Sequence, residues 1–425
     1  MHTVLLTVGD EILLGQIVNT NAAWLGERLA LAGADIQRSE TVGDDRVRMS
    51  ESIQRATADG AELIVITGGL GATHDDITRD VVAEVFERAL EVRPDVMETV
   101  EARYAARGRR MPPANRALAE VPAGFDVLPN PKGVAPGLWG ERQLEDGRRQ
   151  SIVLMPGVPY EMKAISEASV LPRVRQLGVD EVAHRSLLTV GMGENDIAER
   201  LGDLTDLLPD GVGLAFLPSL GVVRLRFTAK GDDADRIRGD LDHAVASVRE
   251  QLGDLVFGED RTTLEGAVGE LLVAQGATLA LAESCTGGAI AARLTEPAGA
   301  SRYLRGGVVA YCNSVKIETL GVDPTVLVLD GAVSETVALQ MARGVRERLG
   351  SDIGVSTTGI AGPSGGSPEK PVGTVWLGYV DAHGEHSVRL RLTTDRMVNI
   401  GLTTTAALNL IRRQRMKASE LSVLS

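Results

Sequence analysis

The segment AlaGluSerCysThrGlyGly at residues 282–288 combines residue types that are used in nucleophilic catalysis. Ser284 and Cys285 fall on a predicted turn from a strand into a helix, and Gly287 and Gly288 open that helix. Such a turn presents a nucleophile beside backbone N–H groups that bind an oxyanion or another anion. The sequence therefore predicts a nucleophilic site in this part of the chain.

The base of this site is expected to be a lysine. No histidine lies between residues 244 and 382, so a Ser-His-Asp triad has little support. The segment ValValAlaTyrCysAsnSerValLys at 308–316 places Tyr311 and Lys316 at the end of a neighbouring predicted strand. In Ser–Lys variants of the triad, a partly buried lysine with a lowered pKa acts as the base.

Two alternatives to a Ser–Lys site remain open at this stage. Cys285 is a rival nucleophile, although its side chain follows that of Ser284 and would point elsewhere, with no local imidazole to activate it. Alternatively, Ser284 is only a helix cap and Lys316 a surface lysine.

A second group of candidate residues lies in four loops of the first 166 residues. The loops are 9–11, 41–45, 67–79 and 155–162, and each follows a predicted strand. Their glycines let the backbone approach a phosphate, and their carboxylates would then require a bridging divalent cation. The acidic residues on this predicted sheet edge are Asp10, Glu11, Asp44, Asp75 and Asp76. The alternative is that these residues are helix caps and turn formers, Asp76 being an N-cap.

The elements that position these loops alternate between strand and helix. In residues 1–166 we expect strands at 3–8, 36–42 and 62–67 and helices at 19–31, 45–58 and 76–90. Apolar strands alternating with helices predict a parallel sheet covered on both faces, with ligands at the carboxyl ends of the strands. The first block is therefore expected to be a three-layer α/β domain.

Two further blocks follow. Residues 167–257 have helix patterns at 195–204 and 235–252 and strand patterns at 213–217 and 222–229, which indicate a small α+β connecting domain. Its GlyMetGlyGlu segment at 191–194 only partly matches the GXXG loop of nucleic-acid-binding domains. Residues 258–415 again alternate strand and helix, with a hairpin at 374–392 and a closing helix at 395–412, and residues 416–425 are expected to form a flexible tail.

Composition narrows the possible partners. The chain has 425 residues, a net charge of −14 and only 3% aromatic residues, so we expect no direct nucleic-acid binding. The N-terminus lacks the pattern of a signal peptide, no segment is apolar enough to span a membrane, and the 2 cysteines are expected to be reduced thiols. A cytoplasmic location follows as the expectation.

Eight separated motifs, spread over nearly the whole chain, resemble those of the CinA family of competence/damage-inducible proteins. The motifs are GDEILLGQIVNTNAAWL (9–25), TGGLGATHDDITRD (67–80), LPNPKGVAPG (128–137), MPGVPYEM (155–162), AESCTGGAIAARL (282–294), VAYCNSVK (309–316), GAVSE (331–335) and GIAGPSGGSPEKPVGTVW (359–376). The resemblance implies a MoaB/MogA-like domain at 1–166, a KH-like domain at 167–257 and a nicotinamide-nucleotide amidohydrolase domain at 258–415.

For the C-terminal domain, the resemblance implies hydrolysis of nicotinamide mononucleotide to nicotinate mononucleotide and ammonia, without a cofactor. Ser284 would be the nucleophile, Lys316 the general base and Tyr311 an assisting residue. The N–H groups around Thr286, Gly287 and Gly288 would bind the oxyanion or the phosphate. The glycine-rich loop would contact the nucleotide through Gly359, Gly362, Gly365 and Gly366.

For the N-terminal domain, the resemblance implies a metal-dependent ADP-ribose pyrophosphatase. Its divalent cation, of the Mg, Mn or Co type, would be held by residues chosen from Asp10, Glu11, Asp44 and Asp76. Substrate would be bound by Thr67, Gly68, Gly69 and Gly71, with Asn130 and Gly157 nearby. Ala72 departs from the proline that the family commonly has after LeuGly.

Other function classes stay open. The first domain could bind or adenylylate molybdopterin, because a shared fold does not choose between reactions. The chain could also be a non-catalytic protein of DNA uptake or damage response, although its acidic charge disfavours contact with DNA. The resemblance further implies a homodimer.

Overall fold

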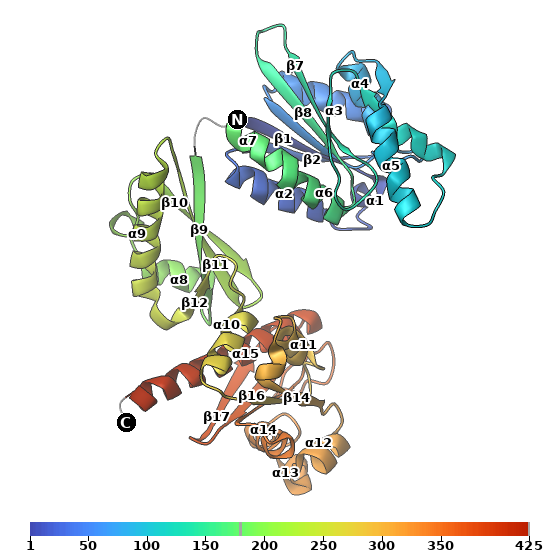
Figure 1. Cartoon of the computed structure of the whole chain (residues 1–425). Helices are drawn as coiled ribbons and strands as arrows, with labels where there is room; N and C mark the ends of the chain where they lie inside the picture. The colour runs from blue at the N-terminus through green and yellow to red at the C-terminus, as the bar shows by residue number, and fades with distance from the viewer. Residues whose placement is uncertain (178–180, 424–425) are drawn as a thin grey trace. The chain divides into compact units, whose positions relative to one another are not determined.

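The computed structural model describes residues 1–177 and 181–423 (Figure 1). It divides into two compact units, one of residues 1–183 and 230–237 and the other of residues 184–229 and 238–425. No helix among the described residues combines the length and the apolar character needed to cross a membrane.

A six-stranded sheet, in the order β2-β1-β3-β8-β7-β6, forms the centre of the N-terminal domain. Its strands are β1 (His2–Val8), β2 (Asp35–Val42), β3 (Leu63–Thr67), β6 (Asp126–Leu128), β7 (Gly137–Gln143) and β8 (Arg149–Met155). The strands β2, β1, β3 and β8 are parallel, whereas β7 and β6 each run antiparallel to their neighbour. The predicted parallel sheet is therefore confirmed for four strands and corrected by two.

Helices cover both faces of this sheet, as predicted (Figure 1). One face is covered by α2 (Thr20–Leu31), α6 (Pro159–Ile165) and α7 (Leu171–Leu177), and the other by α3 (Arg46–Ala58) and α4 (Thr78–Val85). The remaining elements are α1 (Asp10–Leu13), α5 (Pro94–Ala106), the 3-10 helix η1 (Pro113–Ala119), β4 (Leu90–Val92) and β5 (Glu120–Pro122). A π-helical stretch, η2 (Ser166–Val170), joins α6 to α7, so the boundary expected at residue 166 falls inside one helical run.

The helix predicted at 76–90 is shorter than expected. Helix α4 begins at Thr78 because the Asp76 carboxylate accepts N–H groups of the preceding loop instead of those of the helix. The helix ends at Val85, and the chain turns at Glu87, whose φ is +52°, before it continues into strand β4. Local sequence periodicity did not reveal this break because the residues after it are still helix formers.

The middle of the chain forms an α+β domain, as predicted. Its four-stranded sheet has the order β10-β11-β9-β12, of which only β10 and β11 were expected. The elements are β9 (Glu181–Val190), α8 (Glu194–Leu201), η3 (Leu204–Asp206), β10 (Val212–Ser219), β11 (Val222–Gly231), α9 (Ala234–Leu252), η4 (Gly253–Leu255) and β12 (Val256–Glu259).

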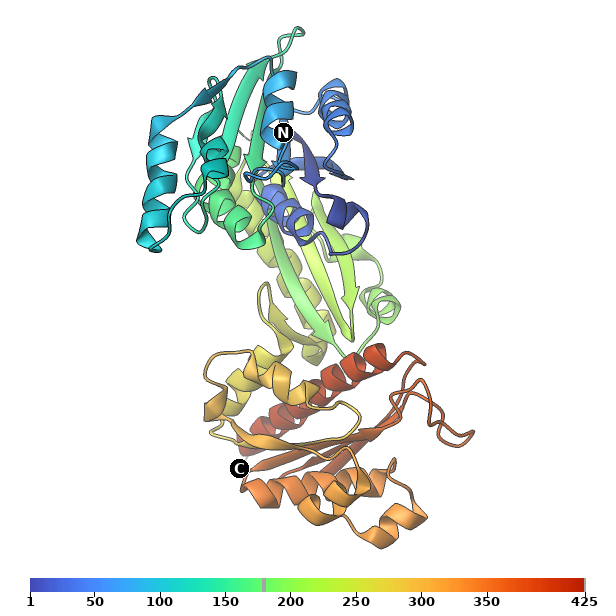
Figure 2. The ribbon, with the colours of Figure 1, turned by 90° about the vertical axis from the view of Figure 1, so that its right-hand side faces the viewer.

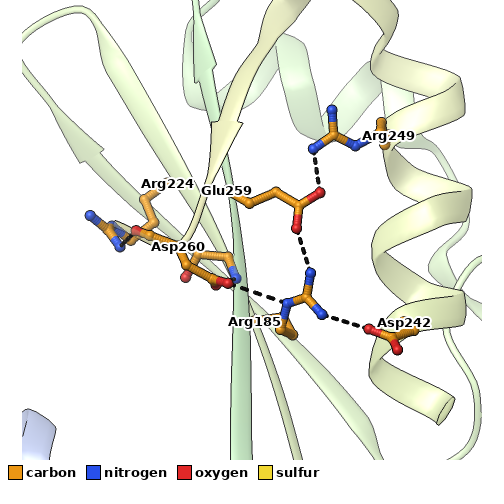
Figure 3. Close-up of polar contacts among 7 residues, drawn as sticks. Arg185, Arg224, Asp242, Arg249, Glu259 and Asp260 are labelled. Carbon is orange, nitrogen blue, oxygen red and sulfur yellow. Dashed lines mark hydrogen bonds and ion pairs between the residues drawn. The ribbon is translucent and has the colours of Figure 1, made fainter. Parts of the chain in front are cut away.

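Arg185 on β9 lies at the centre of an ion-pair network (Figure 3). Its guanidinium lies 2.6 Å from the Asp242 carboxylate and 3.3 Å from that of Asp260, and it also pairs with Glu259. Arg249 contacts the other Glu259 oxygen at 2.5 Å. Glu259 at the end of strand β12 is thus tied by ion pairs to Arg185 of β9 and Arg249 of α9.

The C-terminal domain repeats the three-layer arrangement around a sheet of order β14-β13-β15-β16-β17. Its strands are β13 (Leu279–Glu283), β14 (Leu304–Val309), β15 (Ile353–Gly359), β16 (Thr374–Val380) and β17 (Glu385–Arg391). Strand β13 is parallel to β14 and β15, and β16 and β17 form the predicted hairpin.

Two groups of helices enclose this sheet, and Figure 2 shows the red helix α15 on one face and the orange helices on the other. The first group is α10 (Leu264–Ala274), α11 (Ala289–Thr295) and α15 (Arg396–Val423), and the second is α12 (Asn313–Leu320), α13 (Pro324–Leu329) and α14 (Glu335–Leu349). A short 3-10 helix, η5 (Ala300–Arg302), precedes β14. Helix α15 includes residues 416–423 of the expected flexible tail, and residues 424–425 lie outside the described residues.

Candidate active sites

Ser284 lies in a tight turn between the buried strand β13 and helix α11. Its N–H donates to the Thr357 carbonyl of β15 at 3.0 Å, and its own carbonyl accepts the Gly287 N–H at 3.1 Å. Gly287 and Gly288 have φ values of +63° and +101°, a region that side chains rarely adopt. The two glycines therefore let the chain reverse directly after Ser284 and begin the helix.

Lys316 lies beside Ser284, as the Ser–Lys prediction requires. Its Nζ lies 3.1 Å from Ser284 Oγ and donates to the Ala310 carbonyl at 2.7 Å. Lys316 is 2% exposed and Ser284 is 8% exposed. Burial lowers the pKa of Lys316, because removing water penalises the charged ammonium. The alternative of a surface lysine is wrong.

Burial shifts the pKa of Cys285 upward, whereas it lowers the pKa of Lys316. Burial raises the pKa of its thiol to about 12, so the thiolate that a cysteine nucleophile needs is disfavoured. Its neighbour Thr286 shares a hydrogen bond of 2.8 Å with the Thr357 hydroxyl. Among the described residues, the Thr286 N–H donates to no hydrogen-bond acceptor, which leaves it available for an oxyanion.

The buried carboxylate of Glu283 occupies the N-terminus of α11. It accepts the N–H groups of Gly288 at 3.0 Å, Ile290 at 3.1 Å and Ala291 at 2.9 Å. Gly288 and the N–H groups behind it are therefore engaged by the protein, so the Gly288 N–H is not free for the expected oxyanion or phosphate. Sequence reasoning gave Glu283 no role, because a helix end can be capped by any nearby carboxylate.

Tyr311 is not brought to the Ser284–Lys316 pair by any described hydrogen bond. It is 60% exposed, and its hydroxyl accepts a hydrogen bond from Arg396 at 2.7 Å. Arg396 also donates to the Gly362 carbonyl at 2.9 Å, so one guanidinium links Tyr311 to the glycine-rich loop. Sequence reasoning missed Arg396 because it is a single cation at a helix start with no distinctive spacing.

The glycines of the expected nucleotide loop, residues 359–366, occupy positions that a side chain would not fit or would strain. A Cβ at Gly359 would approach Val375 within 2.6 Å, and one at Gly366 would approach the Val372 nitrogen within 2.7 Å. Gly362 and Gly365 have φ values of +95° and +93°. This close packing places the loop beside Arg396, and its contact with a nucleotide stays a prediction.

The N-terminal domain contains a cavity of about 500 Å³ at the carboxyl ends of its parallel strands. Nearly all of the site residues predicted for this domain line it. They are Glu11, Asp44, Asp76, Thr67, Gly68, Gly69, Gly71 and Gly157. The structure therefore brings together loops that are far apart in the sequence.

Gly68 allows this cavity floor to form, because a Cβ there would lie 2.2 Å from the Val8 carbonyl oxygen. A Cβ on Gly157 would make only an ordinary contact, 3.4 Å from Gly68 Cα. The N–H of Gly68 donates to Met155 and that of Gly71 donates to Asp76, so neither is free to bind phosphate. Within the described residues, the N–H groups of Gly69 and Gly157 have no acceptor and remain candidates.

Carboxylates crowd one side of the cavity. Asp10 and Asp44 each accept the other's backbone N–H, at 3.3 Å and 3.1 Å. Burial, together with the negative charges of Asp10, Glu11 and Asp75, raises the pKa of Asp44. This unrelieved repulsion suits a bound cation.

No three acidic, histidine or cysteine side chains among the described residues converge as a complete metal site. The divalent cation expected at this cavity stays a prediction; Mg²⁺ in proteins commonly takes one or two carboxylates and completes its shell with water and substrate phosphates.

Two predicted residues have structural partners instead. The Asp76 carboxylate holds its own loop by accepting the N–H groups of Gly71 at 2.7 Å and Thr73 at 2.8 Å. Asn130 lines a neighbouring cavity of about 470 Å³ and donates to Glu161, which lines the first cavity, at 2.6 Å. Both positions show that a polar residue in a glycine-rich loop can serve the loop itself.

Sequence reasoning missed two polar residues of the cavity wall, Asn21 and Glu161. Asn21 is 5% exposed and Glu161 is 9% exposed. Each lies near the start of a helix, α2 or α6, where polar side chains are ordinary, so the sequence offered no signal.

Comparison with known protein families assigns a family model to each part of the chain. Residues 4–176 match the model "Probable molybdopterin binding domain", residues 184–258 match "Damage-inducible protein CinA KH domain" and residues 261–415 match "CinA C-terminal domain".

Relatives match over nearly the full length. A CinA-like protein of Salinibacter ruber is 52% identical over 415 residues, covering 97% of this chain and 99% of the relative. A CinA-like protein of Chloroherpeton thalassium is 41% identical, covering 97% and 99%. Among solved structures, competence/damage inducible protein CihA from Agrobacterium tumefaciens is 37% identical, covering 36% of this chain and 96% of that one with a TM-score of 0.34.

Proposed function

Because the chain belongs to the CinA family, we propose that its C-terminal domain hydrolyses nicotinamide mononucleotide to nicotinate mononucleotide and ammonia. The observation that carries the proposal is the buried contact of 3.1 Å between Lys316 Nζ and Ser284 Oγ. A serine beside a lysine of lowered pKa is the arrangement used by Ser–Lys hydrolases.

The mechanism follows from the proton that this contact can move. With Lys316 neutral, the Ser284 hydroxyl donates its proton to the amine as its oxygen attacks the carboxamide carbon. The Thr286 N–H stabilises the oxygen that becomes negative. Collapse of the tetrahedral intermediate transfers the proton from Lys316 to the leaving nitrogen and releases ammonia. Lys316 then deprotonates a water molecule that attacks the ester carbon, and it returns this proton to Ser284 Oγ as the acid leaves.

Arg396 supplies the positive charge that an anionic nucleotide needs. Lys316 is buried and already donates to Ala310, whereas Arg396 is only half-buried and has further N–H groups beyond the two that bond Tyr311 and Gly362. We assign the phosphate of the substrate to Arg396 and the neighbouring loop, with Tyr311 holding the guanidinium in place.

Ammonia release from nicotinamide mononucleotide tests this assignment. Ser284→Ala is expected to abolish release, and Cys285→Ala is the matched control because the adjacent thiol is held protonated. Retention of full activity by Ser284→Ala, or its loss only in Cys285→Ala, would refute the assigned nucleophile.

For the N-terminal domain we propose hydrolysis of the diphosphate of ADP-ribose. The observation that favours it is the 500 Å³ cavity whose lining joins glycine-rich strand ends to Glu11, Asp44, Asp75 and Asp76. A divalent cation bound there would neutralise the diphosphate and lower the pKa of a water molecule. Asp44 is the carboxylate we assign to accept a proton from the attacking water, because it lines the cavity beside the glycine-rich strand ends.

Formation of AMP and ribose 5-phosphate from ADP-ribose, with added Mg²⁺, Mn²⁺ or Co²⁺, tests the second activity. Molybdopterin with ATP is the competing substrate pair. Turnover of the competing pair alone would replace the proposed reaction by adenylylation, whereas Asp44→Asn is expected to remove diphosphate hydrolysis and leave ammonia release unchanged.

A further inference from the structure

Three threonines lie in one row near the carboxyl ends of neighbouring strands of the N-terminal sheet. Thr7 of β1 pairs with Thr41 of β2 on one side and with Thr67 of β3 on the other. Side chains alternate between the two faces of a strand, so all three hydroxyls lie on the face covered by α2. Thr7 and Thr67 also line the 500 Å³ cavity.

The hydroxyls of this row are not equally satisfied. Asn19, just before α2, donates its amide to the Thr7 hydroxyl at 3.0 Å and to the Thr41 hydroxyl at 3.4 Å. Thr67 Oγ1 is buried and has no hydrogen-bond partner among the described residues, and the whole residue is 1% exposed. A buried hydroxyl without a partner is costly, and few such groups occur in folded proteins.

A second unpartnered atom lies in the same cavity wall. The Asn21 Nδ2 donates a hydrogen bond to the Gly157 carbonyl at 2.6 Å. This bond fixes the orientation of the amide, because the flipped amide would place Asn21 Oδ1 against the Gly157 carbonyl oxygen. Asn21 Oδ1 is therefore an acceptor, and it is buried without a partner among the described residues. A phosphate oxygen cannot satisfy it, since an anion offers no hydrogen to donate.

We propose that Asn21 and Thr67 form a subsite that recognises the ribose hydroxyls of the ligand. One hydroxyl donates to Asn21 Oδ1, and its vicinal neighbour exchanges a hydrogen bond with Thr67 Oγ1, which can donate or accept. The identity of the whole ligand as ADP-ribose rests on the proposed function of this domain. The requirement for a hydrogen-bond donor rests on the two unpartnered atoms alone.

The first test compares two isosteric substitutions in adjacent strands. Thr67→Val removes a hydroxyl that has no partner in the free protein, so Tm is expected to stay unchanged or rise while affinity for ADP-ribose falls about five- to tenfold. Thr7→Val removes the acceptor of the Asn19 amide, so its Tm is expected to fall. Calorimetric binding of ADP-ribose with Mg²⁺ present, in an Asp44→Asn background that prevents turnover, measures the affinities, and thermal melts measure Tm. Unchanged affinity of Thr67→Val with a lowered Tm would overturn the subsite.

The second test separates the subsite from the proposed function. Wild-type protein is expected to bind ribose 5-phosphate about five- to tenfold more tightly than 2-deoxyribose 5-phosphate, and Thr67→Val is expected to lose part of this preference. Equal binding of the two sugars, or binding of neither, overturns the subsite. A ribose preference in a protein that neither binds nor cleaves ADP-ribose supports the subsite and refutes the diphosphate function.

Discussion

The two candidate active sites treat charge in opposite ways. In the C-terminal domain a single lysine is buried beside a serine, and burial lowers its pKa toward the neutral form that accepts a proton. In the N-terminal domain several carboxylates share one cavity wall, and burial and mutual repulsion raise the pKa of Asp44. The first site carries its own base, whereas the second has surplus negative charge that a cation and substrate would have to balance.

Their glycine-rich turns teach a common lesson. Gly288 gives its N–H to Glu283, and Gly68 and Gly71 give theirs to Met155 and Asp76. The glycines in both domains thus let the backbone turn, and many of the exposed N–H groups are then used by the protein itself. The anion recognition that we propose is therefore assigned to the few groups left over, such as Arg396 and the N–H groups of Thr286 and Gly69.

The largest expected effect tests whether the C-terminal site depends on its lysine. Lys316→Met keeps the length of the buried side chain but removes the base, so amide hydrolysis is expected to fall about 10³-fold or more. Ammonia release and ADP-ribose hydrolysis should be measured on the same preparation. An equal loss of both activities would contradict the assignment of Lys316 to the C-terminal reaction alone, because it would show that the substitution disturbs the whole protein.

The next effect tests the surplus charge of the N-terminal site. Chelation of divalent cations is expected to lower ADP-ribose hydrolysis about 10²- to 10³-fold, since a metal supplies several kcal/mol of charge stabilisation. Ammonia release from nicotinamide mononucleotide should not change. Restoration of diphosphate hydrolysis by added Mg²⁺ is the control, and insensitivity to chelation would contradict the proposed cation.

A smaller effect is expected at Arg396. Arg396→Ala removes a charge-assisted contact to the substrate phosphate, so KM for nicotinamide mononucleotide should rise about tenfold or more. Arg348→Ala, on an exposed part of α14 in the same domain, is the matched control. A fall in kcat with unchanged KM would instead place Arg396 in the chemistry of the dyad.

The smallest effect concerns stability and pH. The folded-state pKa of Lys316 lies below its ordinary value of 10.5, so folding favours the neutral amine. The associated stability is present above that value and is lost as pH falls through the folded pKa. Between pH 10 and pH 7, the Tm of wild type should therefore fall relative to the Tm of Lys316→Met. A difference that does not vary with pH would contradict the lowered pKa.

Particular residues show how far the sequence reached. The absence of histidine between 244 and 382 pointed to lysine, and the structure placed Lys316 within hydrogen-bond distance of Ser284. The same reasoning grouped Tyr311 with them, but its hydroxyl bonds Arg396. Strand-end position predicts which edge of a sheet a residue occupies, whereas the direction of its side chain depends on what packs around it.

The N-terminal domain gives the same result at the level of the fold. Apolar runs predicted β1, β3 and β8 and hence the edge where the glycine-rich loops meet. The antiparallel strands β6 and β7, the strand β4 and the early end of helix α4, just before the turn at Glu87, were missed. These features depend on long-range pairing and on a single positive φ, which hydrophobic periodicity does not report.

By itself, the sequence determined the family, the order of the three domains and the residue types at both candidate sites, because motifs and periodicity are local properties. Only the tertiary structure decided which of those residues are free to act. It engaged Gly288 and Asp76 in internal hydrogen bonds, buried Lys316 so that its pKa falls, and left Asn21 Oδ1 and Thr67 Oγ1 without partners in the cavity wall. Hydrogen-bond partners and burial arise from contacts between distant segments, so they are absent from the sequence until the chain is folded.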